Sequence, residues 1–75
     1  VEQITYDDKV KDYADTYSKM KPKEAAAIFD TMTDNLGLVA DIMNNMGTEE
    51  RGKILGKMDA TTAAKLTEIM EPTKQ

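Results

Sequence analysis

Five of the six methionines recur at nearly even intervals, and this period limits the possible folds more than any other feature of the chain. They are Met20, Met32, Met46, Met58 and Met70, separated by 12, 14, 12 and 12 residues. The longer gap contains a two-residue insertion at positions 33 and 34. Repetition at a fixed period is typical of repeat architectures. The period therefore predicts four frames that fold as copies of one unit.

Within each frame the apolar residues have helical spacing. Ala25, Phe29 and Met32, for example, stand at i, i+4 and i+7 and share one side of a helix. The residues predicted to form the core in this way are Ile28, Phe29, Met32, Val39, Ile42, Met43, Met46, Ile54, Leu55, Met58, Leu66 and Met70. Helices of about ten residues are marginal alone in water, so we expect them to pack on one another as in a helical solenoid.

A second column of the repeat holds small residues, which are Ala26, Ala40, Gly52 and Ala64. Gly56 follows Gly52 one helical turn later and completes a G-x-x-x-G pair. In a long apolar helix such a pair indicates membrane helix dimerisation, but this helix is short and charged. Two interpretations remain open. The small residues either admit a neighbouring helix of the same chain or form a groove for a partner helix.

The stretch GTEERGKI, from Gly47 to Ile54, resembles a phosphate-binding loop with Ile54 in place of the required Ser or Thr. That motif needs a preceding strand, and the sequence predicts none. Glu49 and Glu50 would also repel a phosphate. The helical repeat explains the same residues, because Ile54 is a core position of its frame, so no nucleotide site is predicted.

Turn and cap signals predict where the helices begin and end. Pro22 suits a first helical turn, and Thr48 and Asp59 suit the N-cap position. We expect Gly47 to adopt the left-handed conformation that commonly follows a helix end. Towards the N-terminus, Thr5 is spaced to form a capping box and begin a longer helix over residues 6–19.

Composition excludes several classes of protein. The chain has no cysteine and no histidine, so thiolate metal sites and histidine-dependent catalysis are absent. Its net charge of −4 argues against nucleic-acid binding. No apolar run approaches the ~20 residues that cross a bilayer, so we expect no membrane contact by this segment. The carboxylates at positions 7, 8, 12 and 15, and at 30, 34 and 41, match no calcium-loop pattern. We predict no enzyme activity, cofactor or metal ligand.

The frames carry a family resemblance. MKPKEAAAIFDTM, LVADIMNNM, MGTEERGKILGKM and MDATTAAKLTEIMEP resemble the helical repeats of the intracellular N-domain of MgtE magnesium transporters. They are also similar to the helical module of the flagellar motor switch protein FliG. The opening M-K-P-x-x-A-A-x-I-F most resembles the C-terminal domain of MotE-like proteins of flagellar operons. The resemblance covers roughly residues 17–72.

The resemblance implies an all-α fold of about five short helices in a right-handed, solenoid-like superhelix. It implies a non-catalytic protein-interaction module that assembles or chaperones flagellar motor parts, with a flagellar motor component as partner. The alternative is a magnesium-responsive regulatory domain. The expected parts are an N-terminal helix over 1–19, a repeat domain over 20–72 and a tail over 73–75. The chain starts at Val1, so we expect an excised segment of a membrane-anchored bacterial protein, or alternatively a cytoplasmic one. The N-terminal helix would continue an upstream coiled coil or form a homodimer.

Overall fold

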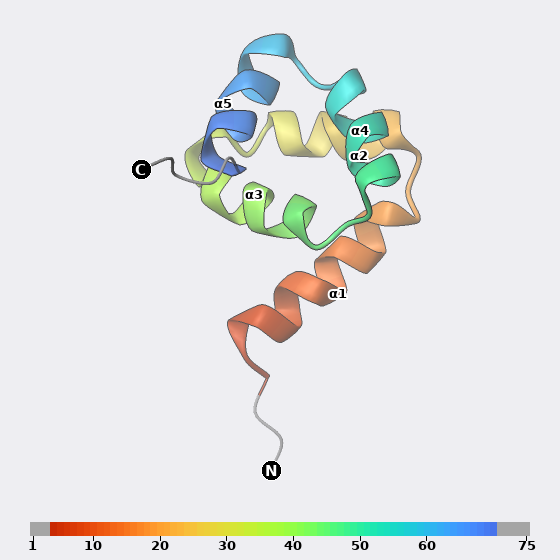
Figure 1. Cartoon of the computed structure of the whole chain (residues 1–75), viewed down its shortest axis with the longest axis vertical. Helices are drawn as coiled ribbons and strands as arrows, with labels where there is room; N and C mark the ends of the chain where they lie inside the picture. Colours follow the sequence, from red (N-terminus) through yellow and green to blue (C-terminus); the bar gives the residue numbers. More distant parts are fainter. Residues whose placement is uncertain (1–3, 71–75) are drawn as a thin grey trace.

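The computed structural model describes residues 4–70, and within them every regular element is helical (Figure 1). The elements are α1 (Tyr6–Ser18), α2 (Pro22–Asp30), the 3-10 turn η1 (Thr33–Asn35), α3 (Leu36–Asn44), α4 (Thr48–Lys57) and α5 (Ala60–Met70). The all-α prediction of five helices is confirmed for this part of the chain. The two inserted residues begin η1, which accounts for the longer interval in the repeat. The expected tail, residues 73–75, and the ends of the two expected segments, residues 1–3 and 71–72, lie outside the described residues.

Most of the predicted helix starts are confirmed, because they depend on local hydrogen bonds. The Thr5 hydroxyl accepts from the Asp8 N–H at 3.1 Å, and the Thr5 N–H donates to the Asp8 carboxylate at 3.3 Å, which completes the capping box. Pro22 is the first residue of α2. The Asp59 carboxylate accepts from the second and third N–H groups of α5, at 3.2 and 3.4 Å. Each contact satisfies donors that the first helical turn leaves unpaired.

The expected conformation of Gly47 is wrong. Its φ of −65° and ψ of 155° are extended, and it stands at the N-cap position of α4, so Thr48 is the first helical residue. α3 closes without a left-handed residue, because the Asn45 N–H donates to the Ile42 carbonyl and the Met46 N–H to the Met43 carbonyl, both at 3.1 Å. These bonds tighten the last turn and satisfy the carbonyls that a left-handed glycine would otherwise serve.

Each helix packs chiefly on the helix two places along the chain. The principal contacts join α1 with α3, α2 with α4, and α3 with α5. Figure 1 shows α2, α3, α4 and α5 around a common centre, with α1 extending away from them towards the N-terminus. Because α3 has principal partners on two sides, it is the most deeply packed element, and Val39, Ala40, Ile42 and Met43 are all buried in it.

The core lies where these helices meet. Of the residues expected there, the buried ones are Phe29, Val39, Ile42, Met43, Met46, Ile54, Met58 and Leu66. Met32, Leu55 and Met70 are partly buried and pack against this cluster. Val10 and Ala14 of α1 also belong to it, as do Ala25, Ala26 and Ala40.

The prediction of a core position is wrong for Ile28, whose side chain is 38% exposed. The buried side of α2 consists of Ala25, Ala26 and Phe29. Phe29 packs against the ring of Tyr17 in α1, with ring centroids 4.7 Å apart. Ile28 lies about 100° round the helix from Phe29, at the edge of this buried side.

Candidate functional site

The column of small residues divides into two environments. Ala26 and Ala40 are buried, whereas Gly52, Gly56 and Ala64 are exposed. A Cβ atom added at Gly52 or Gly56 would meet nothing within 4 Å. The interpretation as an internal close-packing site is therefore wrong for the two glycines. The physical reason is the rotation of α4, which turns Ile54 into the core and leaves the glycines on the opposite side.

The outward side of α4 combines these glycines with charged residues. Glu49, Gly52, Lys53, Gly56 and Lys57 are all exposed and follow one another at intervals of one helical turn or less. The Lys53 ammonium lies 4.0 Å from the Glu49 carboxylate, and both side chains are more than half exposed. Such a pair is screened by water and leaves Lys53 free to contact a partner. The glycines add no side chains that would obstruct an approach.

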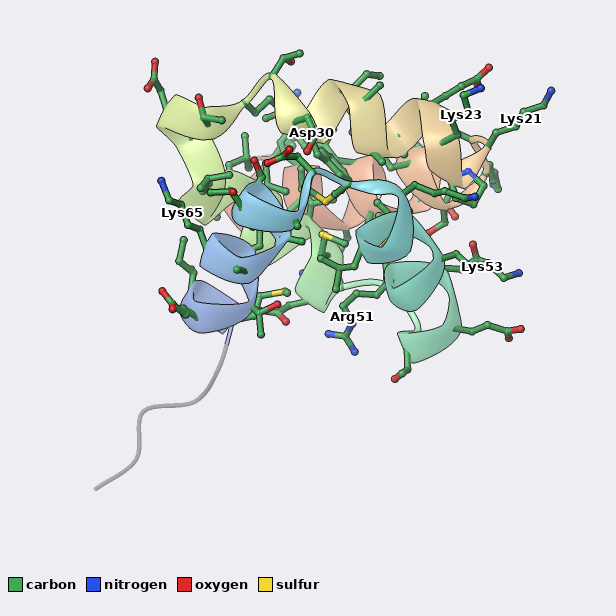
Figure 2. All side chains as sticks on the ribbon, turned by 90° about the horizontal axis from the view of Figure 1, so that it is seen from above. Lys21, Lys23, Asp30, Arg51, Lys53 and Lys65 are labelled. Atoms are coloured by element: carbon green, nitrogen blue, oxygen red, sulfur yellow. The ribbon has the colours of Figure 1, made fainter. Side chains whose placement is uncertain are left out.

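Lysines of α2 extend this surface. Lys21, at the N-cap position of α2, and Lys23, in its first turn, are exposed. Figure 2 shows Lys21, Lys23 and Lys53 extending towards the same side of the molecule, while Lys65 extends on the other side. The packing of α2 on α4 brings these lysines together across two helices. We call Lys21, Lys23, Lys53 and Lys57 the lysine face.

Side-chain hydrogen bonds join neighbouring elements on either side of α4. The Arg51 guanidinium donates to the Asn44 side-chain oxygen at 3.3 Å, which ties α4 to the end of α3. Beyond the other end of α4, the Asp59 N–H donates to both carboxylate oxygens of Asp30, at 3.2 and 3.1 Å, and links α2 to the start of α5. These contacts join α4 to α3 and α2 to the start of α5.

The outward side of α1 has the opposite charge. Asp8, Asp12 and Asp15 are exposed and point away from Val10 and Ala14, which are the buried residues of this helix. We call these three aspartates the acidic side of α1, within which the Asp15 carboxylate is paired with the Lys19 ammonium at 3.0 Å.

A surface pocket of about 310 Å³ lies at the N-terminal end of this acidic side, lined by Ile4, Asp8, Lys9 and Asp12. The Ile4 side chain is 65% exposed, so the pocket has one apolar wall beside two carboxylates.

One contact ties the start of α1 to α3. The Tyr6 hydroxyl donates to the Asp41 carboxylate at 2.6 Å. This hydrogen bond, with a smaller contribution from desolvation and the charges of Asp41 and Asp7, raises the pKa of Tyr6 above its usual value. The raised pKa identifies a structural link, since Tyr6 lies on an exposed surface and not in a cleft.

The described residues offer no constellation for metal binding. Within residues 4–70, no group of three or more Asp or Glu side chains is arranged to hold a metal ion. Asp30 and Asp41, two of the carboxylates noted in the sequence, instead accept the hydrogen bonds from the Asp59 N–H and the Tyr6 hydroxyl. In the same part of the chain, no helix has the length and apolar character needed to span a bilayer.

Comparison of the chain with models of protein families, with curated proteins and with solved structures finds no match.

Sequence reasoning missed both charged surfaces as sites. The i, i+4 spacing of Lys53 and Lys57 was visible, as was the series of aspartates in α1. The proximity of Lys21 and Lys23 to α4 depends on the packing of α2, which no local signal reveals.

Proposed function

We propose that this chain is a non-catalytic protein-interaction module that binds an acidic surface of a partner protein through the lysine face. The observation that carries the proposal is the gathering of exposed lysines over two packed helices of a chain whose net charge is −4. A local positive surface on an acidic molecule steers partners of opposite charge and orients them on approach.

The strength expected of such a surface is modest. An exposed charge pair contributes about 0.2–1 kcal/mol, so the four lysines together contribute roughly 1–4 kcal/mol to binding. Gly52 and Gly56 support the contact differently, because they let a partner approach the α4 backbone closely.

The resemblance to MotE-like proteins supports a flagellar motor component as the partner and motor assembly or chaperoning as the setting. We also propose that the helices form a solenoid-like, right-handed superhelix. The packing of each helix on the next but one supports this arrangement. A solenoid stabilises each unit through its neighbours and leaves an extended surface for partners.

Binding of purified flagellar motor components to the immobilised chain tests this function. The double variant Lys21→Glu with Lys53→Glu is expected to bind the partner about tenfold more weakly. This change corresponds to a loss of about 1.4 kcal/mol in binding free energy. The matched control is Lys11→Glu with Lys65→Glu, which makes the same change in net charge at exposed lysines outside the lysine face. Equal losses in both double variants would mean that only net charge matters and would overturn the assignment of the face.

The magnesium-responsive alternative is separated by a different measurement. A protein that binds Mg²⁺ in its folded state melts at a higher temperature as the ion is added. A saturable rise at millimolar Mg²⁺, absent at matched ionic strength, would favour the magnesium-responsive domain over the interaction module.

A further inference from the structure

We propose that one partner of the lysine face is the acidic side of α1 in a second copy of this chain. The inference rests on the proposed function and names an occupant for the same face. The two surfaces have opposite charge, both are exposed, and each lies on a helix with a single principal neighbour, α3 for α1 and α2 for α4.

The pocket at the start of α1 has the chemistry to receive a lysine side chain. Ile4 provides an apolar wall for the methylene groups, and Asp8 and Asp12 provide carboxylates for the ammonium group. Lysine commonly buries its stem along apolar surface while its charged end stays polar and hydrated. Lys9 also lines the pocket and reduces its negative charge, so the pocket accepts one cation and not several.

On α4, either Lys53 or Lys57 is suited to enter this pocket. The two lysines lie one helical turn apart, and each directly follows a glycine where an added Cβ would meet no atom within 4 Å. A second helix can therefore lie along α4 without meeting a side chain at Gly52 or Gly56.

In one chain, the pocket at the start of α1 lies away from the lysines of α4 (Figure 1). Figure 1 shows α1 extending away from α4 towards the N-terminus, with α3 and α2 as their separate packing partners. A contact between α1 of one copy and α4 of another uses different patches on the two molecules. Such a contact is heterologous, so each copy keeps one free surface and the association continues head to tail unless a ring closes.

Sedimentation equilibrium of the 75-residue chain over a concentration series up to millimolar tests the association. At about 0.1 M NaCl the Debye length is about 10 Å. Salt at this concentration screens the long-range repulsion between the net charges of two copies more than the attraction between charged groups in contact. The average mass is expected to rise with concentration. At about 1 M NaCl, where the Debye length is about 3 Å, the mass is expected to return towards that of the monomer. A monomer under both conditions overturns the proposal.

Two complementary variants identify the surfaces. Lys53→Gln with Lys57→Gln removes charge from the lysine face. Ile4→Ser with Asp12→Asn alters the pocket while sparing Asp8, which caps α1. Each variant alone is expected to associate about tenfold more weakly than the parent chain. Their mixture is expected to form a one-to-one dimer that grows no further, because only one intact pair of surfaces remains.

Control and contrary outcomes complete the test. Lys65→Gln with Asp34→Asn changes exposed charges outside both surfaces and is expected to associate as the parent chain does. The proposal is overturned if the pocket variant alone, or the lysine variant alone, associates as strongly as the parent chain. It is also overturned if the mixture of the two variants stays monomeric. If the chain is monomeric but its lysine face still binds flagellar motor components, the proposed function stands and the second copy is excluded as the occupant.

Discussion

The second and third helices and the last two carry the same repeat but bury different parts of it. In α2 and α3 the small column is inside the molecule, at Ala26 and Ala40, while in α4 and α5 it faces solvent, at Gly52 and Ala64. Ile28 and Ile54, which stand eight residues into their frames, behave in the opposite way, since Ile28 of α2 is 38% exposed and Ile54 of α4 is 1% exposed. Equivalent positions in a sequence repeat are therefore not equivalent in burial.

Neighbouring helices account for this difference. α3 packs on both α1 and α5, so both sides of it are covered, and α2 buries Ala25, Ala26 and Phe29. α4 has α2 as its principal neighbour, and one side is enough to bury Ile54. The outward side of α4 stays exposed and is available to partners.

The largest expected effect tests the difference in burial between Ile54 and Ile28. Ile54→Ala is expected to lower the free energy of unfolding by about 2–5 kcal/mol, because it leaves a cavity in the core. Ile28→Ala should cost about 1 kcal/mol or less, because much of this side chain is already in water. Urea denaturation followed by circular dichroism measures both. Similar losses would show that Ile28 is buried in solution and would remove the contrast between α2 and α4.

A smaller effect is expected from filling the small column. Ala40→Leu should destabilise the fold by about 1–3 kcal/mol, because the added atoms overpack the buried surface of α3. Ala64→Leu adds the same atoms to an exposed position of α5 and should change stability by no more than about 0.5 kcal/mol. The same denaturation experiment applies. A marked loss at Ala64 would mean that α5 is covered in solution.

Alanine at the exposed glycines should stabilise the chain. Gly52→Ala and Gly56→Ala are each expected to add up to about 1 kcal/mol, because alanine has the higher helix propensity and the site has room for a Cβ. Thermal melts of the two single variants measure the gain. A lower melting temperature would indicate that the glycines are in close contact with another helix after all.

The smallest effect concerns the attachment of α1 to the inner helices. The raised pKa of Tyr6 means that the fold favours its neutral hydroxyl, which donates to Asp41. That contribution is complete below the pKa of the unfolded chain, about 10, and is lost as the pH rises through the higher folded value. Stability of the parent chain should therefore fall more steeply above about pH 10 than that of Tyr6→Phe. Parallel pH profiles of urea midpoints would contradict this link.

Much of the fold was predictable because its signals are local. The capping box of Thr5, the position of Pro22 and the cap at Asp59 each depend on atoms within a few residues, and all three are as expected. The conformation of Gly47 was not predictable in the same way. Its expected left-handed form competes with the tight closing turn of α3, and the sequence offers no measure of which is favoured.

The candidate site was predictable only in part. The spacing of Lys53 and Lys57 placed them on one side of a helix, and the aspartates of α1 formed an evident series. The glycines stand out in the sequence, but their pattern leaves open whether they admit a helix of the same chain or a partner helix. The addition of Lys21 and Lys23 to the same surface required the contact between α2 and α4.

The sequence by itself determined that the chain forms short helices, where most of them begin, and which side chains are apolar enough to enter a core. These properties follow from hydrogen bonds and periodicity within about one or two helical turns. The tertiary structure alone decided that Ile28 and Gly52 face solvent and that lysines of two helices share one surface. Burial depends on which helix covers which side, and that is a property of the packed chain and not of any single segment.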